Sequence, residues 1–400
     1  MWNRKKAHAR YWQSSEKFVT EDELIDQLIG KASCECENGS HPLLSDIVTK
    51  LQIDAGSGRS SINAFCGLTD GVDRFGSVLI NQKYCYISIG VDLIRGLRAA
   101  ARFYLTLTEM SHAFLNMWIK ANNDRNAKRA VMEQFDEISY RVNRCIWRSM
   151  PDKASCENMG GGSRRGIIVD DIRDSLEDFA DDYCANLDDG LALIDELVVG
   201  GIVWVICHEF AHIAKVNISK KARGAGLEGL RSSISEFLKD RADEIDISDQ
   251  HYDEYLCDYI AHEYIHSSRL DEKWKFSALI ASQLLCAVIA VSEEGIDDDG
   301  EQTHPSPLLR IFMNELAYLN MLRDDNVFEV NSNMGVIRAI EFARFVTGDY
   351  ASSERSFLEF IMGADVKLQV NMIEYLAKCD EHFFSGIRDD LAKMMSASSS

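Results

Sequence analysis

Residues 205–214 carry the sequence Val205-Ile206-Cys207-His208-Glu209-Phe210-Ala211-His212-Ile213-Ala214. Glu209 is the single carboxylate in this apolar run, which predicts a buried helix. The two histidines and Glu209 form a HExxH pattern, and residues four apart share one face of a helix, so both imidazoles can bind one zinc ion. Glu209 is then placed to take a proton from zinc-bound water. The pattern indicates hydrolysis of a peptide bond.

Composition narrows the class of protein around this motif. The chain has 400 residues, of which 46% are hydrophobic and 27% charged, and it is long enough for a main domain with helical extensions. The formal net charge of -21 argues against binding a nucleic-acid backbone, which needs a basic surface. It fits a protein or peptide partner that is neutral or basic.

Cysteine usage and hydropathy predict a cytoplasmic protein. Eleven scattered cysteines form no disulfide framework, which is typical of a reducing compartment. The basic N-terminus lacks the apolar segment of a signal peptide. Residues 191–207 contain Asp195 and Glu196, and residues 276–291 are too few for a membrane span, so both stretches are predicted to be buried helices.

The pattern along the chain predicts a mainly helical α+β fold in three parts. Residues 1–60 form an N-terminal helical extension, residues 61–310 contain the motif, and residues 311–400 form a C-terminal helical region. Residues 77–80 and 84–89 are short and β-prone, and the turn Asn81-Gln82-Lys83 between them predicts a hairpin in a small sheet. Helices are predicted from Gly90 to near Met117, over 128–149 and over 276–291. Gly224-Ala225-Gly226 predicts a break before a helix over 230–242.

A catalytic zinc site needs a third protein ligand, and the segment after residue 252 offers one. Glu254 and Asp258 lie four apart and therefore project from the same face of the helix predicted over 252–267. Glu254 can complete a set of two histidines and a glutamate. Asp258, one turn further on, can accept the outer N–H of a zinc-bound histidine and fix its tautomer.

A second HExxH pattern occurs at His262-Glu263-Tyr264-Ile265-His266. It continues the same helix in steps of four from Glu254, and polar residues follow it. Glu294 and Asp298, again four apart, could supply its third ligand, although the glycines and acidic residues around them disfavour a rigid helix. The sequence therefore favours the first pattern as the metal site.

HEFAH followed by ExxxD resembles the glutamate-type zinc metallopeptidases, or gluzincins. The element Glu254-x-x-Cys257-Asp258-x-x-Ala261 is similar to the E-x-x-A-D-x-x-A element of HtpX-like and CAAX-processing peptidases, with Cys257 in place of alanine. Asn63-Ala64-Phe65 and Thr303-His304-Pro305 with Arg310 are similar to two further elements of that group. HtpX-like enzymes are membrane proteins, so the soluble Lit-type phage-exclusion peptidases, which act on a cytosolic translation factor, are the nearer analogy.

The resemblance implies a zinc peptidase domain over 61–310. In that family pattern His208, His212 and Glu254 bind Zn²⁺, Glu209 is the general base and Asp258 orients His208. His304 either contacts the substrate oxyanion or belongs to a loop that Pro305 shapes. An exposed edge of the small sheet would suit an extended peptide substrate.

Two other functions fit the same sequence. One is a protein-binding module in which the zinc is structural and turns nothing over. The other is a protease that stays inert until an activating partner binds. Glu209 distinguishes the first of these from a peptidase, because a structural site has no use for a base beside the metal.

Overall fold

The computed structural model describes residues 63–69, 76–81, 84–148, 190–215, 218–238, 248–268, 270 and 272–293, and single positions at 305, 310, 314, 342, 345–346, 389–391 and 393. This part of the chain is mainly helical with one small sheet, which confirms the predicted fold class at that level. The N-terminal extension predicted over 1–60 lies outside the described residues, as do most of 311–400.

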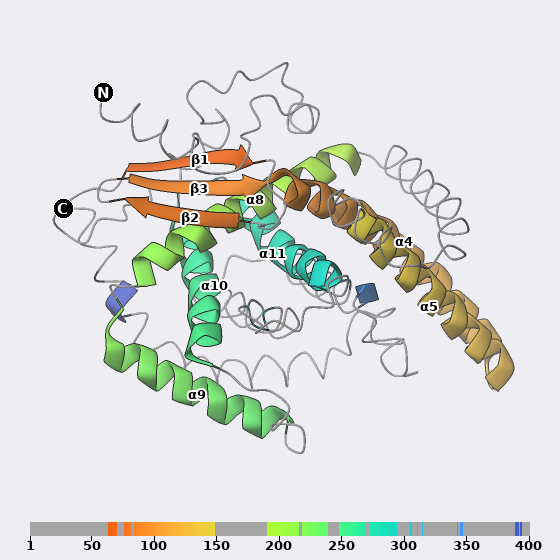
Figure 1. The fold of residues 1–400 in the computed structure, drawn as a ribbon. Helices are drawn as coiled ribbons and strands as arrows, with labels where there is room; N and C mark the ends of the chain where they lie inside the picture. The colour runs from red at the N-terminus through yellow and green to blue at the C-terminus, as the bar shows by residue number, and fades with distance from the viewer. Residues whose placement is uncertain are drawn as a thin grey trace, which may run out of the picture.

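The sheet has three strands, β1 (Asn63–Thr69), β2 (Gly76–Asn81) and β3 (Tyr84–Gly90), in the order β1-β3-β2 (Figure 1). β2 and β3 pair antiparallel with Asn81 opposite Tyr84, so the predicted hairpin is confirmed. β1 pairs parallel to β3 on its other side, with Asn63 opposite Tyr84. The central strand β3 leads directly into the first long helix.

That helix, α4 (Val91–Ala121), packs along α5 (Arg125–Arg148), and Figure 1 shows the pair extending away from the sheet. The turn between them uses Asn122 with a positive φ of 47°, a conformation that asparagine tolerates better than most residues. Asp124 directly precedes α5, and its Oδ1 accepts the backbone N–H of Asn126 at 2.8 Å. Phe345, from the C-terminal part of the chain, packs edge-on against Phe135 of α5.

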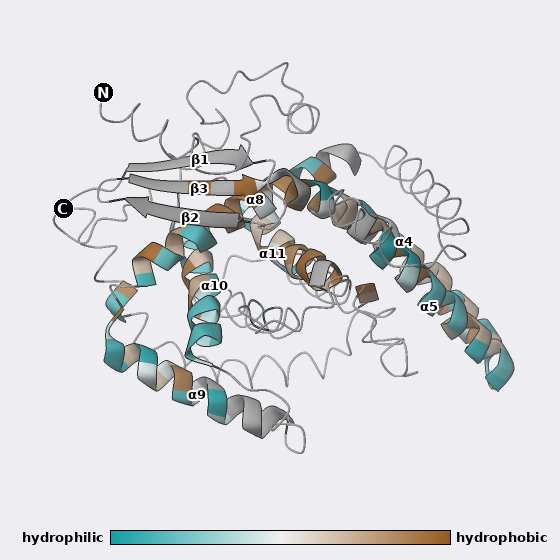
Figure 2. Cartoon of the chain, in the orientation of Figure 1, coloured by the Kyte–Doolittle hydropathy of each residue, from teal (hydrophilic) through white to brown (hydrophobic). Residues whose placement is uncertain are grey.

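The centre of the molecule is formed by α8 (Gly190–Ala214) and α11 (Glu272–Glu293), which pack closely on each other. Their residues are largely hydrophobic in Figure 2, whereas the far end of α5 is hydrophilic. A Cβ at Gly200 would lie 2.4 Å from the backbone carbon of Ser277, so glycine is required for this close approach. HExxH thus lies on a rigid central helix.

Two described helical segments, Leu193–Ala214 and Trp274–Val291, are long and apolar enough to cross a membrane. Within the molecule, however, 94% and 78% of their apolar windows are buried, and the core helices of globular proteins meet the same criteria of length and composition. The predicted burial of both stretches is confirmed.

Two further helices flank the end of α8. α9 (Lys220–Leu238) runs without interruption through Gly224 and Gly226, so the predicted break is wrong. A glycine costs a helix only about 1 kcal/mol relative to alanine, which the rest of α9 outweighs. The N-cap of α10 (Asp249–Ser267) is Ser248, whose side chain accepts the backbone N–H of His251 at 3.1 Å.

Candidate metal centre

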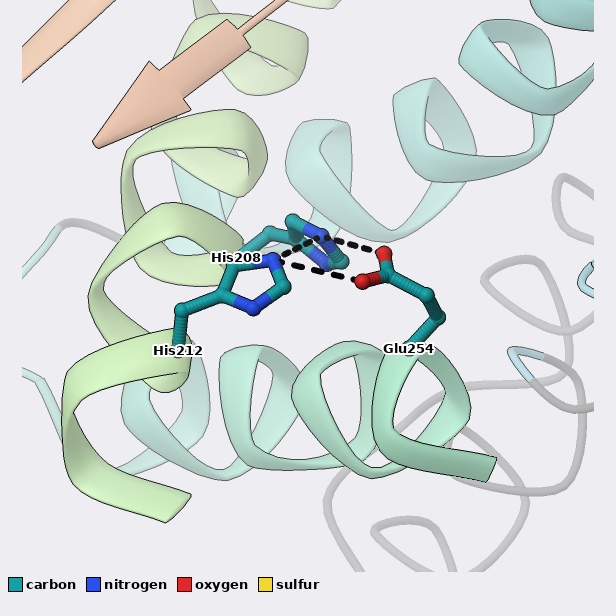
Figure 3. Close-up of side chains that lie close together, drawn as sticks. All are labelled: His208, His212 and Glu254. Atoms are coloured by element: carbon teal, nitrogen blue, oxygen red, sulfur yellow. Dashed lines mark hydrogen bonds and ion pairs between the residues drawn. The ribbon is translucent and has the colours of Figure 1, made fainter. Parts of the chain in front are cut away.

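Three side chains from two helices meet where α8 packs against α10 (Figure 3). His208 and His212 of α8 present their Nε2 atoms 3.2 Å apart. Glu254 of α10 reaches them with both carboxylate oxygens, Oε2 at 3.4 Å from Nε2 of His208 and Oε1 at 3.7 Å from Nε2 of His212. The sequence predicted these three residues as a set, and the structure brings them together.

The spacing of the three ligand atoms fits a tetrahedral zinc ion. Metal–ligand distances of about 2.0–2.1 Å place tetrahedral ligand atoms about 3.3 Å apart. The observed separations of 3.2, 3.4 and 3.7 Å lie close to that edge length. Two imidazole nitrogens and a carboxylate are also a known catalytic zinc set. The residues present therefore fit the metal that the sequence predicts.

Asp258 lies behind His208 and is itself held by an arginine. Its Oδ1 is 2.7 Å from Nδ1 of His208, the nitrogen on the far side of the ring from the other ligands. Arg310 binds the same carboxylate with two donors, Nε to Oδ2 at 2.9 Å and Nη2 to Oδ1 at 2.7 Å. Burial acts to raise the pKa of Asp258, but Arg310 and His208 outweigh it and hold that pKa below its usual value. Asp258 thus remains a carboxylate that fixes the orientation of the imidazole.

The two histidines differ in electrostatic environment. Burial acts to lower the pKa of His208, but Asp258 and then Glu254 outweigh burial and raise it to about 9. Burial and the neighbouring His208 lower the pKa of His212 to about 4, so its ring is neutral at pH 7. A neutral imidazole is the form that binds a metal, and the carboxylates beside His208 favour a cation, whether proton or metal, at that position.

The far side of His212 contacts Cys257 and also Lys215, which the sequence did not indicate as part of the site. Its Nδ1 lies 3.3 Å from Nζ of Lys215 and 3.4 Å from Sγ of Cys257. Lys215 also pairs with Asp253 at 3.3 Å, and Arg223 of α9 binds the same carboxylate. Asp253, next to Glu254 in sequence, is therefore committed to two cations and not to the metal. The spacing of Lys215, three residues after His212, was the available signal.

Of the other residues predicted for the site, the structure describes Glu209. Glu209 is 8% exposed on α8, one position from His208. His304, Glu294 and Asp298 lie outside the described residues. Within the part of the chain that the structure describes, His208, His212 and Glu254 are the one group of histidine, cysteine and carboxylate side chains close enough to hold a metal ion.

Replacing Asp258 should weaken the site without removing a ligand. Asp258→Ala is expected to lower zinc affinity about 10- to 100-fold, because His208 loses the acceptor that orients its ring. Competition with a chromophoric chelator measures this. Asp253→Ala is the matched control, since Asp253 is on the same helix but pairs with Lys215 and Arg223. A larger loss with Asp253→Ala would mean that the predicted register of α10 is wrong by one residue.

The glutamate of the second HExxH pattern should be dispensable. Glu263 is partly exposed on α10 and lies nine residues beyond Glu254, about 180° round the helix at about 100° per residue. Glu263→Gln is therefore expected to leave zinc content unchanged, as elemental analysis of the purified variant would show. His266→Ala, which removes a histidine of HEYIH, should retain the metal as well, and loss of zinc from that variant would place HEYIH at the metal site instead.

No protein-family model, curated protein or solved structure significantly matches the chain.

Proposed function

We propose that the chain is a zinc-dependent endopeptidase of the gluzincin type that acts on a protein or peptide substrate. The observation that carries the proposal is the meeting of His208, His212 and Glu254 at tetrahedral spacing, with Glu209 on the same helix as the two histidines. Asp258, 2.7 Å from the outer nitrogen of His208, adds the orienting carboxylate typical of zinc-binding histidines.

Three ligand groups from the described residues leave one position of a tetrahedron for water or substrate, as catalytic zinc sites require. Bound zinc would polarise the scissile carbonyl and lower the pKa of the attacking water. Glu209 would accept the proton of that water and pass it to the leaving amine. A purely structural site fills all four positions with protein ligands and has no role for Glu209.

The candidate metal site is buried on the side of His208 and Glu254 and more exposed on the side of His212. The side chains of His208 and Glu254 are 8% and 10% exposed, whereas that of His212 is 23% exposed. Exclusion of water around His208 strengthens electrostatic interactions there. The more exposed His212 marks the direction from which a substrate would approach.

The sheet offers a surface for an extended substrate. β1 and β2 form its two edges on either side of β3, and among the described residues no fourth strand pairs with the outer side of either. β2 packs against α8, the helix that carries HExxH. We propose that a substrate strand adds to an edge of this sheet through main-chain hydrogen bonds. The net charge of -21 favours neutral or basic substrates.

The proposed place of action is the cytoplasm. Cys145, Cys207, Cys257 and Cys286 are buried and form no disulfide, which suits a reducing compartment.

The proposed function can be tested before any substrate is identified. Cells expressing the wild-type chain are compared with cells expressing Glu209→Gln by quantitative profiling of protein N-termini. We expect new N-termini that appear with the wild type alone. Identical profiles, with both proteins loaded with zinc and folded, would contradict the proposed function in those cells, and addition of lysate from the native host would then test the activating partner.

A further inference from the structure

The second HExxH pattern takes part in a ladder of facing pairs between α8 and α10. Trp204, His208 and His212 are spaced four residues apart on α8, and Glu254, Asp258 and His262 are spaced four apart on α10. Residues at this spacing form one stripe along a helix. The pairs run in opposite order along the two helices, as in antiparallel packing. They are His212 with Glu254, His208 with Asp258, and Trp204 with His262.

The third pair is in direct contact with the metal ligands through Trp204. The indole ring stacks on the imidazole of His208, with ring centroids 5.2 Å apart and an angle of 23° between the planes. Its Nε1–H donates to Nε2 of His262 at 3.4 Å. Trp204 therefore covers one face of His208 while its own orientation depends on His262.

His262 in turn contacts Asn314, a residue further along the chain. Its Nε2 lies 3.1 Å from Oδ1 of Asn314, and Nδ2 of Asn314 is 3.6 Å from Sγ of Cys286. His262 and Asn314 are both fully buried. Arg310, four residues before Asn314, binds Asp258. Arg310 and Asn314 therefore contact Asp258 and His262 in the same order in which these two residues follow each other along α10.

We propose that His262, the first histidine of HEYIH, is a positioning residue for the zinc ligand His208 and acts through the stacked indole of Trp204. The proposal rests on the zinc site described above. Asp258 fixes the edge of the His208 ring at Nδ1, and Trp204 fixes its face, so together they define the direction in which Nε2 points. His262 then acts at the metal centre although the second motif is not itself a metal site.

The chemistry of His262 explains why an apolar residue would not serve. A buried indole N–H and a buried carboxamide both need hydrogen-bonding partners, and Nε2 of His262 faces both of them. In its unprotonated form this nitrogen accepts the indole N–H of Trp204 and then donates nothing to Oδ1 of Asn314. Glutamine can supply an acceptor for Trp204 and a donor for Asn314 from nearly the same place, whereas phenylalanine fills the volume without either. The two substitutions therefore separate hydrogen bonding from packing.

The experiment measures zinc affinity by chelator competition and the visible spectrum of the cobalt-loaded protein, which reports ligand geometry. His262→Phe is expected to weaken zinc binding about 10-fold and to shift the cobalt bands, as loss of an outer orienting partner does elsewhere. His262→Gln is expected to remain within about twofold of the wild type, because the polar contacts are kept. His266→Ala, the other histidine of HEYIH, is the matched control and should change neither quantity.

Wild-type affinity and an unchanged cobalt spectrum in folded His262→Phe would overturn the positioning role. Should that variant fail to fold, Trp204→Phe keeps a ring beside His208 but removes the N–H that binds His262, and it should shift the cobalt bands. Failure of both to fold would assign His262 to the core alone. Absence of zinc binding by the wild type would instead contradict the proposed function, so the two failures are distinguishable.

Discussion

Replacing Glu209 with glutamine is expected to lower peptide hydrolysis at least about 100-fold while zinc content stays at the wild-type value. A general base contributes typically 10²- to 10⁴-fold to a rate, and glutamine keeps the shape of the side chain but cannot accept the proton. The measurement is cleavage of a substrate found by N-terminal profiling, together with elemental analysis of the same preparation.

The control for this experiment is the same substitution in the second motif. Glu263→Gln changes a partly exposed residue on α10 and should leave cleavage nearly intact. Near-normal cleavage by Glu209→Gln would show that the water is activated in another way. Loss of activity in Glu263→Gln alone would move the active site to HEYIH.

The second large effect is loss of the metal when a ligand is removed. His208→Ala, His212→Ala and Glu254→Ala should each reduce zinc from about one ion per chain toward zero, because a site with two protein ligands holds the ion poorly. Elemental analysis after gel filtration measures this. Retention of stoichiometric zinc by all three variants would place the ion elsewhere in the chain.

Thermal unfolding with and without added zinc gives a second readout. A ligand at 100 times its dissociation constant stabilises the folded state by about 2.7 kcal/mol, so zinc should raise the melting temperature of the wild type. It should not raise that of Glu254→Ala. Comparison of the metal-free proteins controls for any direct effect of the substitution on stability.

Much of the described fold follows from short-range patterns. β-prone segments on either side of Asn81-Gln82-Lys83 were enough to predict the β2–β3 hairpin, because its register is set by the turn. The parallel pairing of β1 with β3 was not predicted in detail, since it depends on contacts between distant segments. Gly224 and Gly226 misled the prediction for α9, because the cost of a glycine is smaller than the stability of a 19-residue helix.

The site was predictable where helical spacing alone determines which residues face each other. HExxH and the pair Glu254 and Asp258 each share a helix face whatever the tertiary structure. Helical spacing says nothing about contacts between different segments. The contact of Arg310 with Asp258 and that of His262 with Trp204 were therefore found only in the structure. α10 is buried on several sides, and hydrophobic periodicity therefore could not indicate its inward face.

The most direct test of the zinc centre is X-ray absorption spectroscopy at the zinc edge on the loaded wild-type protein. We expect four nitrogen or oxygen neighbours at about 2.0–2.1 Å, with the multiple-scattering signature of two imidazoles. Glu254→Ala should lose this spectrum. A sulfur shell at about 2.3 Å would show that cysteine binds the ion, and that result would contradict the assignment of His208, His212 and Glu254 as its ligands.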